Sequence, residues 1–348
     1  MERIKKFIEQ NSLNDYQILT TLGSSLFGTV YKARRIKDNA IVSIKEYSRY
    51  QEGAEETFKN DINYYKELEC DNIVKQLHTK QTDDYLYIIR EYCSGTLEEF
   101  IQCHNNKIPV NEIQKILKQL MVVFQKLDEK QLIHRDIKPS NIFFSFKGLK
   151  DFQCKLSGIY LCTTEGNIES KNIITGTRYI TPPEGIKGEK ITMKYDLWSV
   201  GVLIYYMIKG KYPFEGKRDK MLLNNIDKGI NLKDLSGDND LDDLLGKCLQ
   251  KDLDNRISWN DFFEHNFFKK KFSEKKRGKG KMEDLIIQLG DIKTWYDENR
   301  KTDLELIKRY SNFMYTCELK KEGDEFNNEV NKLIKRIQKN LKVIFEKK

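Results

Sequence analysis

The run IHRDIKPSNIFF, at residues 133–144, places three chemically useful side chains close together. Asp136, Lys138 and Asn141 supply a carboxylate, an ammonium and an amide within one short stretch. A carboxylate can accept a proton, an ammonium can stabilise developing negative charge, and an amide oxygen can hold a hard cation. This stretch could therefore combine acid–base chemistry with charge stabilisation.

The same run matches the pattern H-R-D-x-K-P-x-N at every defining position, and a chance match of this length is negligible. On these residues the chain resembles a protein kinase, and the lysine at 138 is the form seen in Ser/Thr kinases. The resemblance implies that Asp136 orients the substrate hydroxyl and accepts its proton, and that Lys138 stabilises the transferring phosphoryl group. It also implies that Asn141 holds magnesium, and that His134 and Arg135 are structural.

Other kinase landmarks follow in the expected order. IVSIKEY resembles the strand that carries the phosphate-pairing lysine, GTRYITPPE the segment ending in A-P-E, and DLWSVG the buried helix below the catalytic loop. The resemblance implies a nucleotide site formed by Gly23, Gly28, Val30, Lys45, Glu91, Cys93 and Asn141. It implies further structural roles for Thr177, for Asp196, and for Glu184 in a pair with Arg256.

The pattern along the chain predicts a bilobal α+β fold, which is also what the resemblance implies. Short β-like runs with one helical stretch at 53–69 extend from Tyr16 to about Ile89, and mainly helical periodicity follows to about Phe268. The predicted kinase-like domain therefore spans 16–268. The run RISWNDFFEHNFF, which closes it, is similar to the end of the domain in the autophagy-initiating Ser/Thr kinases.

Three further regions flank this domain. Residues 1–15 form a short N-terminal segment, and residues 269–281 form a basic linker with eight Lys or Arg and one Glu. Residues 282–348 carry apolar side chains at helical spacing, which predicts a small bundle or hairpin. The last helix has near-heptad spacing, so a coiled-coil contact with a partner is the alternative.

The expected nucleotide site departs from the kinase pattern at several positions. Ser25 replaces the middle glycine of the phosphate loop, Asp61 replaces the helix glutamate that pairs with Lys45, and Arg90 stands before the hinge. A buried guanidinium is costly unless paired. Asp61 is the expected partner of Arg90, and the alternative is that Arg90 turns toward solvent.

The largest departure lies in CKLSGIYL, at residues 154–161. Gly158, Ile159 and Tyr160 stand where the family has Asp-Phe-Gly, so the main protein ligand of magnesium is missing. A competing register would use Asp151 and Phe152, but it shortens the family's interval after the catalytic loop and breaks the strand match.

Two functions follow from this pattern. The leading interpretation is a pseudokinase, acting as a signalling scaffold or allosteric regulator, that could still bind ATP but holds magnesium weakly. The alternative is an active or weakly active Ser/Thr kinase that transfers the γ-phosphate of ATP to protein hydroxyls, because Lys45, Asp136, Lys138 and Asn141 remain.

Composition excludes several other classes. Hydrophobic residues make up 39% and charged residues 33%, as in soluble globular proteins, and the longest apolar run is too short to cross a bilayer. No secretory signal is evident, so a cytoplasmic location is expected. The net charge of +8 is concentrated in the linker without interleaved aromatic residues, which disfavours nucleic acid. Protein partners are expected at the 282–348 helices, and the sequence leaves the oligomeric state open.

Overall fold

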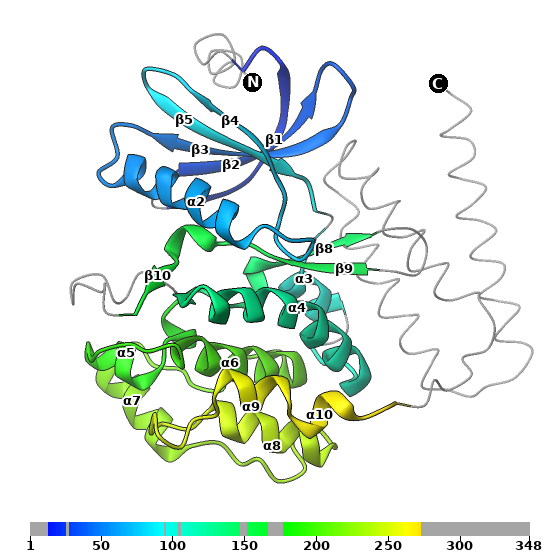
Figure 1. Ribbon diagram of the computed structural model, residues 1–348, viewed down its shortest axis with the longest axis vertical. Coiled ribbons are helices and arrows are strands. Elements are labelled where there is room, and N and C mark those ends of the chain that lie inside the picture. Colours follow the sequence, from blue (N-terminus) through cyan, green and yellow to red (C-terminus); the bar gives the residue numbers. More distant parts are fainter. Residues whose placement is uncertain are drawn as a thin grey trace, which may run out of the picture. The chain divides into compact units, whose positions relative to one another are not determined.

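The computed structural model describes residues 13–25, 28–93, 95–103, 106–146, 152–165 and 177–272. The predicted segment up to residue 12, the linker beyond residue 272 and the extension at 282–348 lie outside the described residues. Within the described part, the chain folds as a sheet-rich small lobe and a mainly helical large lobe (Figure 1). The predicted bilobal α+β architecture is confirmed.

The small lobe is a five-stranded antiparallel sheet in the order β1-β2-β3-β5-β4, with helix α2 packed on one face (Figure 1). Strand β4 was not predicted, because its sequence QLHTKQ contains a single strongly apolar residue and lies at the edge of the sheet. The elements are β1 (Tyr16–Ser25), β2 (Gly28–Arg35), β3 (Ile41–Ser48), α2 (Ala54–Leu68), β4 (Gln76–Gln81) and β5 (Tyr85–Glu91).

Strand register decides which side chains of the small lobe lie on the sheet face that packs against α2. Val30 pairs with Lys45 across β2 and β3, and Ser43 pairs with Arg90 across β3 and β5. Because side chains alternate along a strand, Lys45 and Arg90 share the sheet face that packs against α2. The opposite face carries a separate apolar cluster that includes Leu13.

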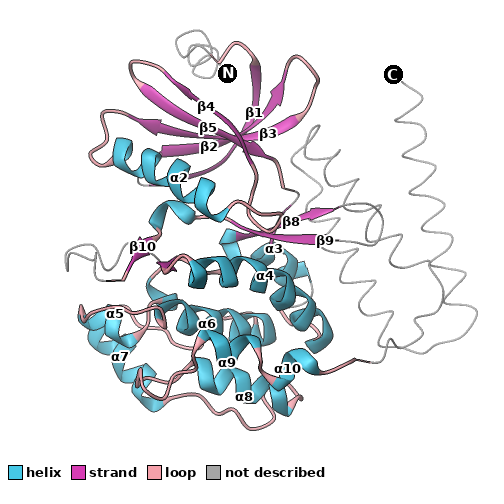
Figure 2. Ribbon diagram, in the orientation of Figure 1, coloured by secondary structure: helices cyan, strands magenta, loops and turns pink. Residues whose placement is uncertain are grey.

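The large lobe is mainly helical (Figure 2). Helices α4, α6, α8 and α9 contribute to its main apolar cluster, and a second cluster includes side chains of α5, α6 and α7. The helices of this lobe are α3 (Leu97–Cys103), α4 (Val110–Glu129), α5 (Pro183–Lys187), α6 (Tyr195–Lys209), α7 (Asp219–Lys228), α8 (Asn239–Cys248), α9 (Trp259–Phe263) and α10 (Asn266–Lys269). Helices α4, α6, α8 and α9 match the helical periodicity of the sequence near 111–130, 194–209, 241–250 and 259–266. No helix in the described residues is long and apolar enough to cross a membrane.

The remaining elements are short strands and 3-10 turns. They are β6 (Gly95–Thr96), β7 (Leu132–Ile133), η1 (Pro139–Asn141), β8 (Ile142–Phe146), β9 (Phe152–Leu156), η2 (Ile159–Leu161), β10 (Thr163–Thr164) and η4 (Arg178–Ile180). The segment after α2 is hydrogen-bonded to β9, since Asn72 donates to the Cys154 carbonyl at 2.9 Å and accepts from the Leu156 amide at 2.7 Å.

This connection fixes the position of Gly158 directly after β9. Residues Cys154 to Leu156 form the end of the strand, as the first register requires. Phe152 opens the same strand and pairs with Phe146 of β8. The competing register needs Phe152 in the turn after a strand, and its Asp151 lies outside the described residues.

Candidate active site

The loop after β7 holds the three residues expected to act on a hydroxyl. Asp136 is nearly buried, and its carboxylate contacts the Lys138 ammonium at 2.8 Å. It also accepts hydrogen bonds from the Asn141 amide at 2.6 Å and from the Thr177 backbone amide at 3.3 Å. Lys138 donates to the Thr177 hydroxyl at 2.6 Å. The structure therefore brings Asp136, Lys138, Asn141 and Thr177 into one network.

Asp196 and Arg135 hold the backbone of this loop in place. Asp196, at the start of α6, accepts from the backbone amides of His134 at 2.6 Å and Arg135 at 2.9 Å. Arg135 has a left-handed backbone, with φ of 68°, and its guanidinium donates to the Leu161 carbonyl at 2.6 Å. These hydrogen bonds hold the loop in a strained conformation that its backbone would not favour alone.

The predicted pair between Glu184 and Arg256 forms in the large lobe. The Arg256 guanidinium is fully buried and donates to both carboxylate oxygens of Glu184, at 2.6 and 3.0 Å. This two-pronged geometry supplies the strong hydrogen bonds that a buried guanidinium needs. The pair anchors α5, and with it the segment that begins at Thr177.

His134 is fully buried and uses both ring nitrogens as a neutral imidazole would. Its Nδ1 accepts from the Asp136 amide at 3.2 Å, and its Nε2 lies 3.1 Å from the Ser157 carbonyl. Burial lowers the pKa of His134 to about 4, although the negative charge of Asp136 opposes that shift. A second proton on Nδ1 would face an amide hydrogen, so the folded state resists protonation.

This arrangement predicts a specific loss of stability in acid. Because a histidine in the unfolded chain has a pKa of about 6.5, the unfolded state binds the proton before the folded state does as the pH falls from 6.5 toward 4, which favours unfolding. At pH 5 the cost is about 2 kcal/mol relative to pH 7. Urea unfolding at pH 7 and pH 5 measures the loss in free energy of unfolding. In His134→Phe this loss should be smaller than in the unaltered protein by this amount. Equal drops in the two proteins would contradict the assignment.

A cluster of buried charges occupies the small-lobe side of the site. Asp61 is fully buried on α2 and accepts from Arg90 at 2.5 Å and from the Tyr47 hydroxyl at 2.5 Å. Lys45 lies farther away, with its Nζ atom 3.5 Å from the same carboxylate. The expected pair between Asp61 and Arg90 forms, and Arg90 does not turn toward solvent. Asp61 also reaches Lys45 at a longer distance.

The charges of this cluster depend on one another. Burial lowers the pKa of Lys45 to about 8, the attraction of Asp61 opposes that shift, and Arg90 adds to it. Burial alone would raise the pKa of Asp61, but Arg90 and Lys45 outweigh it and hold that pKa below its usual value. The Asp61 carboxylate therefore pairs with two cations, and its contact with Arg90 is the shorter of the two.

Tyr160 covers the ammonium that the family uses to bind phosphates. The Lys45 Nζ atom lies 3.6 Å from the centre of the Tyr160 ring and 4.5 Å from the centre of the Tyr47 ring. Contacts of this kind attract a cation to the face of an aromatic ring. Burial raises the pKa of Tyr160 to about 12, with the carboxylates of Asp136 and Asp61 adding to the shift. The ring is therefore neutral and lies directly against the Lys45 ammonium.

Gly158 lies in the left-handed region, with φ of 89° and ψ of 13°. A Cβ atom added there would lie 2.8 Å from Nδ2 and 3.3 Å from Cγ of Asn141. The Asn141 amide is turned onto Asp136, where it donates to both the carbonyl and the carboxylate. Asn141 therefore crowds the position where a side chain at residue 158 would begin.

These residues do not fit the magnesium site of the family. Gly158 supplies no carboxylate, Asn141 can offer only its neutral amide oxygen, and Asp136 is already engaged by Lys138, Asn141 and Thr177. Among the described residues, no three His, Cys, Asp or Glu side chains gather as a metal-binding group. Magnesium prefers several oxygen ligands in strict octahedral geometry, which this set does not provide.

The hinge and phosphate-loop residues are placed as follows. Glu91 accepts from the Lys155 ammonium at 2.5 Å, and its backbone carbonyl accepts from the Ser43 hydroxyl at 3.2 Å. Cys93 is buried, and burial raises the pKa of its thiol to about 12. At Gly28 an added Cβ atom would collide with the Glu46 carbonyl at 1.7 Å, so glycine is required there for packing. An added Cβ atom at Gly23 meets nothing within 4 Å.

Sequence reasoning missed three contributors to this site: Tyr160, Tyr47 and Lys155. Tyr160 was noted only as a replacement for the glycine of Asp-Phe-Gly. Alternation along β3 places Tyr47 on the face of Lys45 and was an available signal. The contact between Tyr160 and Lys45 had no such signal, because it depends on how η2 packs beneath α2.

Comparison with known proteins agrees with this geometry. The protein kinase domain family matches residues 16–268, so the chain belongs to the protein kinase family. Serine/threonine-protein kinase ULK3 of Xenopus laevis is 33% identical over 73% of this chain and 55% of its own length. Serine/threonine-protein kinase ATG1a of Arabidopsis thaliana is 27% identical over 74% of this chain and 42% of its own length. The probable serine/threonine-protein kinase nek2 of Dictyostelium discoideum is 30% identical over 76% of this chain and 65% of its own length.

These relatives bear out the resemblance to autophagy-type Ser/Thr kinases. The chain spans about half the length of the curated relatives named above, from 42% of ATG1a to 65% of nek2. The family as a whole uses ATP with magnesium.

Proposed function

We propose that this protein is a pseudokinase, a kinase-fold module that regulates or scaffolds other proteins and transfers phosphate extremely slowly. The observation that carries this proposal is Gly158. The position has no carboxylate, and the Asn141 amide lies across the place where its side chain would begin. Loss of a magnesium ligand removes electrostatic stabilisation of the transferring phosphoryl group and costs several powers of ten in rate.

A second feature supports the same proposal. Lys45 lies between the Tyr160 ring and the Asp61 carboxylate, so bound phosphates must compete with both for its ammonium. Nucleotide binding is therefore weak and independent of magnesium. We expect the protein to act in the cytoplasm, with partners at the kinase-fold surface and at the predicted helices of 282–348.

The alternative function is a weakly active Ser/Thr kinase. The observation that favours it is the intact network of Asp136, Lys138 and Thr177, whose hydrogen bonds suit a loop that receives a hydroxyl. Such an enzyme would use ATP with a cation held by Asn141 and a carboxylate recruited from elsewhere.

Phosphate incorporation from γ-labelled ATP separates the two functions. The full chain is incubated with ATP, magnesium and a general protein substrate, and incorporation into the chain and the substrate is counted. Asp136→Asn is the matched control, because it keeps the shape of the side chain and removes its basicity. The pseudokinase proposal predicts equal counts for both proteins. Incorporation in the unaltered chain that is lost in Asp136→Asn would establish the enzyme instead.

A further inference from the structure

Strand β9 is hydrogen-bonded to both lobes of the kinase fold. On the large-lobe side, the Gln119 side chain of α4 accepts from the Cys154 amide at 2.8 Å and donates to the Phe152 carbonyl at 3.2 Å. On the small-lobe side, the segment after α2 holds the end of the strand, where the Leu156 carbonyl accepts from the Val74 amide at 3.0 Å. A change in the angle between the lobes therefore strains the contacts of β9.

Glu91 adds a charged contact between β9 and the hinge. Its Oε1 atom accepts from the Lys155 ammonium of β9 at 2.5 Å and from the Lys75 backbone amide at 2.6 Å. The Lys155 side chain is 8% exposed and the Glu91 side chain 23%, so little water competes for the pair. Hydrogen bonds between charged groups are about twice as strong as neutral ones. We call the Glu91 carboxylate, the Lys155 ammonium and the Lys75 amide the hinge clamp.

We propose that the hinge clamp holds the two lobes at one angle and resists opening and closing of the cleft between them. Kinases are among the proteins that close around a ligand by hinge motion. In this chain such a motion must break the contacts of β9 on one side, either those of Gln119 or those of the hinge clamp. Separating Lys155 from Glu91 would leave a nearly buried ammonium unpaired, because no other described carboxylate forms an ion pair with it. The protein therefore offers a partner the same shape with or without a ligand in the cleft.

Hydrogen exchange measured by mass spectrometry on the full chain tests the hinge clamp. Lys155→Met removes the ammonium and keeps a long unbranched side chain. We expect it to speed exchange by about tenfold or more in peptides that cover the amides of Val74, Lys75, Glu91 and Leu156, which donate hydrogen bonds at this junction. Exchange in α6, in the core of the large lobe, should not change. Lys155→Arg keeps the charge and should keep exchange slow.

Acetylation of Lys45 reports opening of the cleft itself. Lys45 belongs to β3 of the small lobe and its side chain is 9% exposed. The Tyr160 ring, from the turn after β9, lies 3.6 Å from its Nζ atom. Opening of the lobes would expose this amine to a water-soluble acetylating reagent. We expect labelling of Lys45, followed by mass spectrometry, to be several times faster in Lys155→Met than in the unaltered protein.

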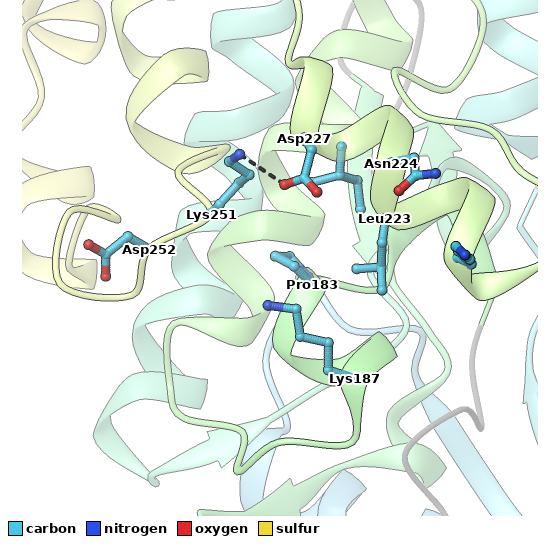
Figure 3. Close-up of a pocket in the computed structure, with 9 residues that line it drawn as sticks. Pro183, Lys187, Leu223, Asn224, Asp227, Lys251 and Asp252 are labelled. Carbon is cyan, nitrogen blue, oxygen red and sulfur yellow. Dashed lines mark hydrogen bonds and ion pairs between the residues drawn. The ribbon is translucent and has the colours of Figure 1, made fainter.

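Lys251→Met is the matched control for the loss of a paired lysine. Lys251 forms an ion pair with Asp227 at 3.0 Å in a pocket of the large lobe (Figure 3), but the two side chains are 50% and 67% exposed. Exposed pairs contribute little to stability, so exchange at the hinge clamp should not change. Glu91→Gln/Lys155→Met should speed exchange no more than the larger single change does, because both changes remove the same pair.

Two results would overturn the proposal. The first is unchanged exchange at the hinge clamp, or unchanged labelling of Lys45, in Lys155→Met. The second is a rise in the exchange of α6 equal to that at the hinge clamp, because it would show a loss of global stability rather than a release of the lobes.

Discussion

Replacing Gly158 with aspartate is expected to restore magnesium-dependent binding of ATP. The new carboxylate supplies the missing ligand, and its Cβ atom displaces the end of the Asn141 side chain, which can rotate away. Aspartate tolerates the left-handed backbone of this position better than most residues. We expect ATP affinity in magnesium to rise at least tenfold, or about 1.4 kcal/mol, and phosphate incorporation to rise with it.

Gly158→Asn is the matched control for this change. Asparagine has the size of aspartate and tolerates the same backbone, but it brings no negative charge. Calorimetric titration with ATP, in magnesium and in EDTA, measures the effect. Adding Tyr160→Gly to Gly158→Asp should increase affinity further, because it uncovers Lys45. If Gly158→Asn raises the affinity for ATP in magnesium as much as Gly158→Asp does, the missing carboxylate is not the cause of weak binding in the unaltered protein.

Replacing Asp61 with leucine is expected to destabilise the fold strongly. The change leaves Arg90 and Lys45 as buried cations without their carboxylate, since their side chains are only 10% and 9% exposed. Removing one partner of a buried ion pair costs about 3–5 kcal/mol. For a domain of this size, the midpoint of thermal unfolding should fall by roughly 10 °C.

A double-mutant cycle assigns this loss to the pair. Asp61→Leu/Arg90→Leu should lose less stability than the sum of the two single changes, because the unpaired guanidinium is removed. Glu55→Ala is a matched control, since Glu55 forms a half-exposed pair with Arg49 on the same lobe, and it should cost at most about 1 kcal/mol. Additive losses from Asp61 and Arg90 would show that the two side chains do not interact.

The sequence predicted this ion pair for a physical reason. The kinase resemblance places Arg90 before the hinge and Asp61 at the helix position of the family's glutamate, and a buried guanidinium needs a partner. Gly158 was likewise predictable, because the strand CKL fixes its position in the chain. Hydrophobic periodicity gave the helices of the core, where apolar stripes are long.

Other features depended on tertiary contacts. Strand β4 has too few apolar residues to be distinguished from a loop, and its pairing with β5 determines its structure. Helix α7 buries only Leu222 and Ile226, so its apolar stripe was too narrow to stand out. The Tyr160 ring reaches Lys45 only because η2 packs against α2, which no local pattern encodes.

Thermal unfolding with ATP tests the central claim most directly, because the claim concerns the magnesium ligand rather than the rate of transfer. The full chain is unfolded with saturating ATP in magnesium, with ATP in EDTA, and with magnesium alone. A ligand at 100 times its dissociation constant adds about 2.7 kcal/mol, which raises the midpoint by several degrees. We predict the same midpoint for ATP with magnesium and ATP with EDTA. A midpoint several degrees higher only when ATP and magnesium are both present would contradict the loss of the magnesium site at Gly158.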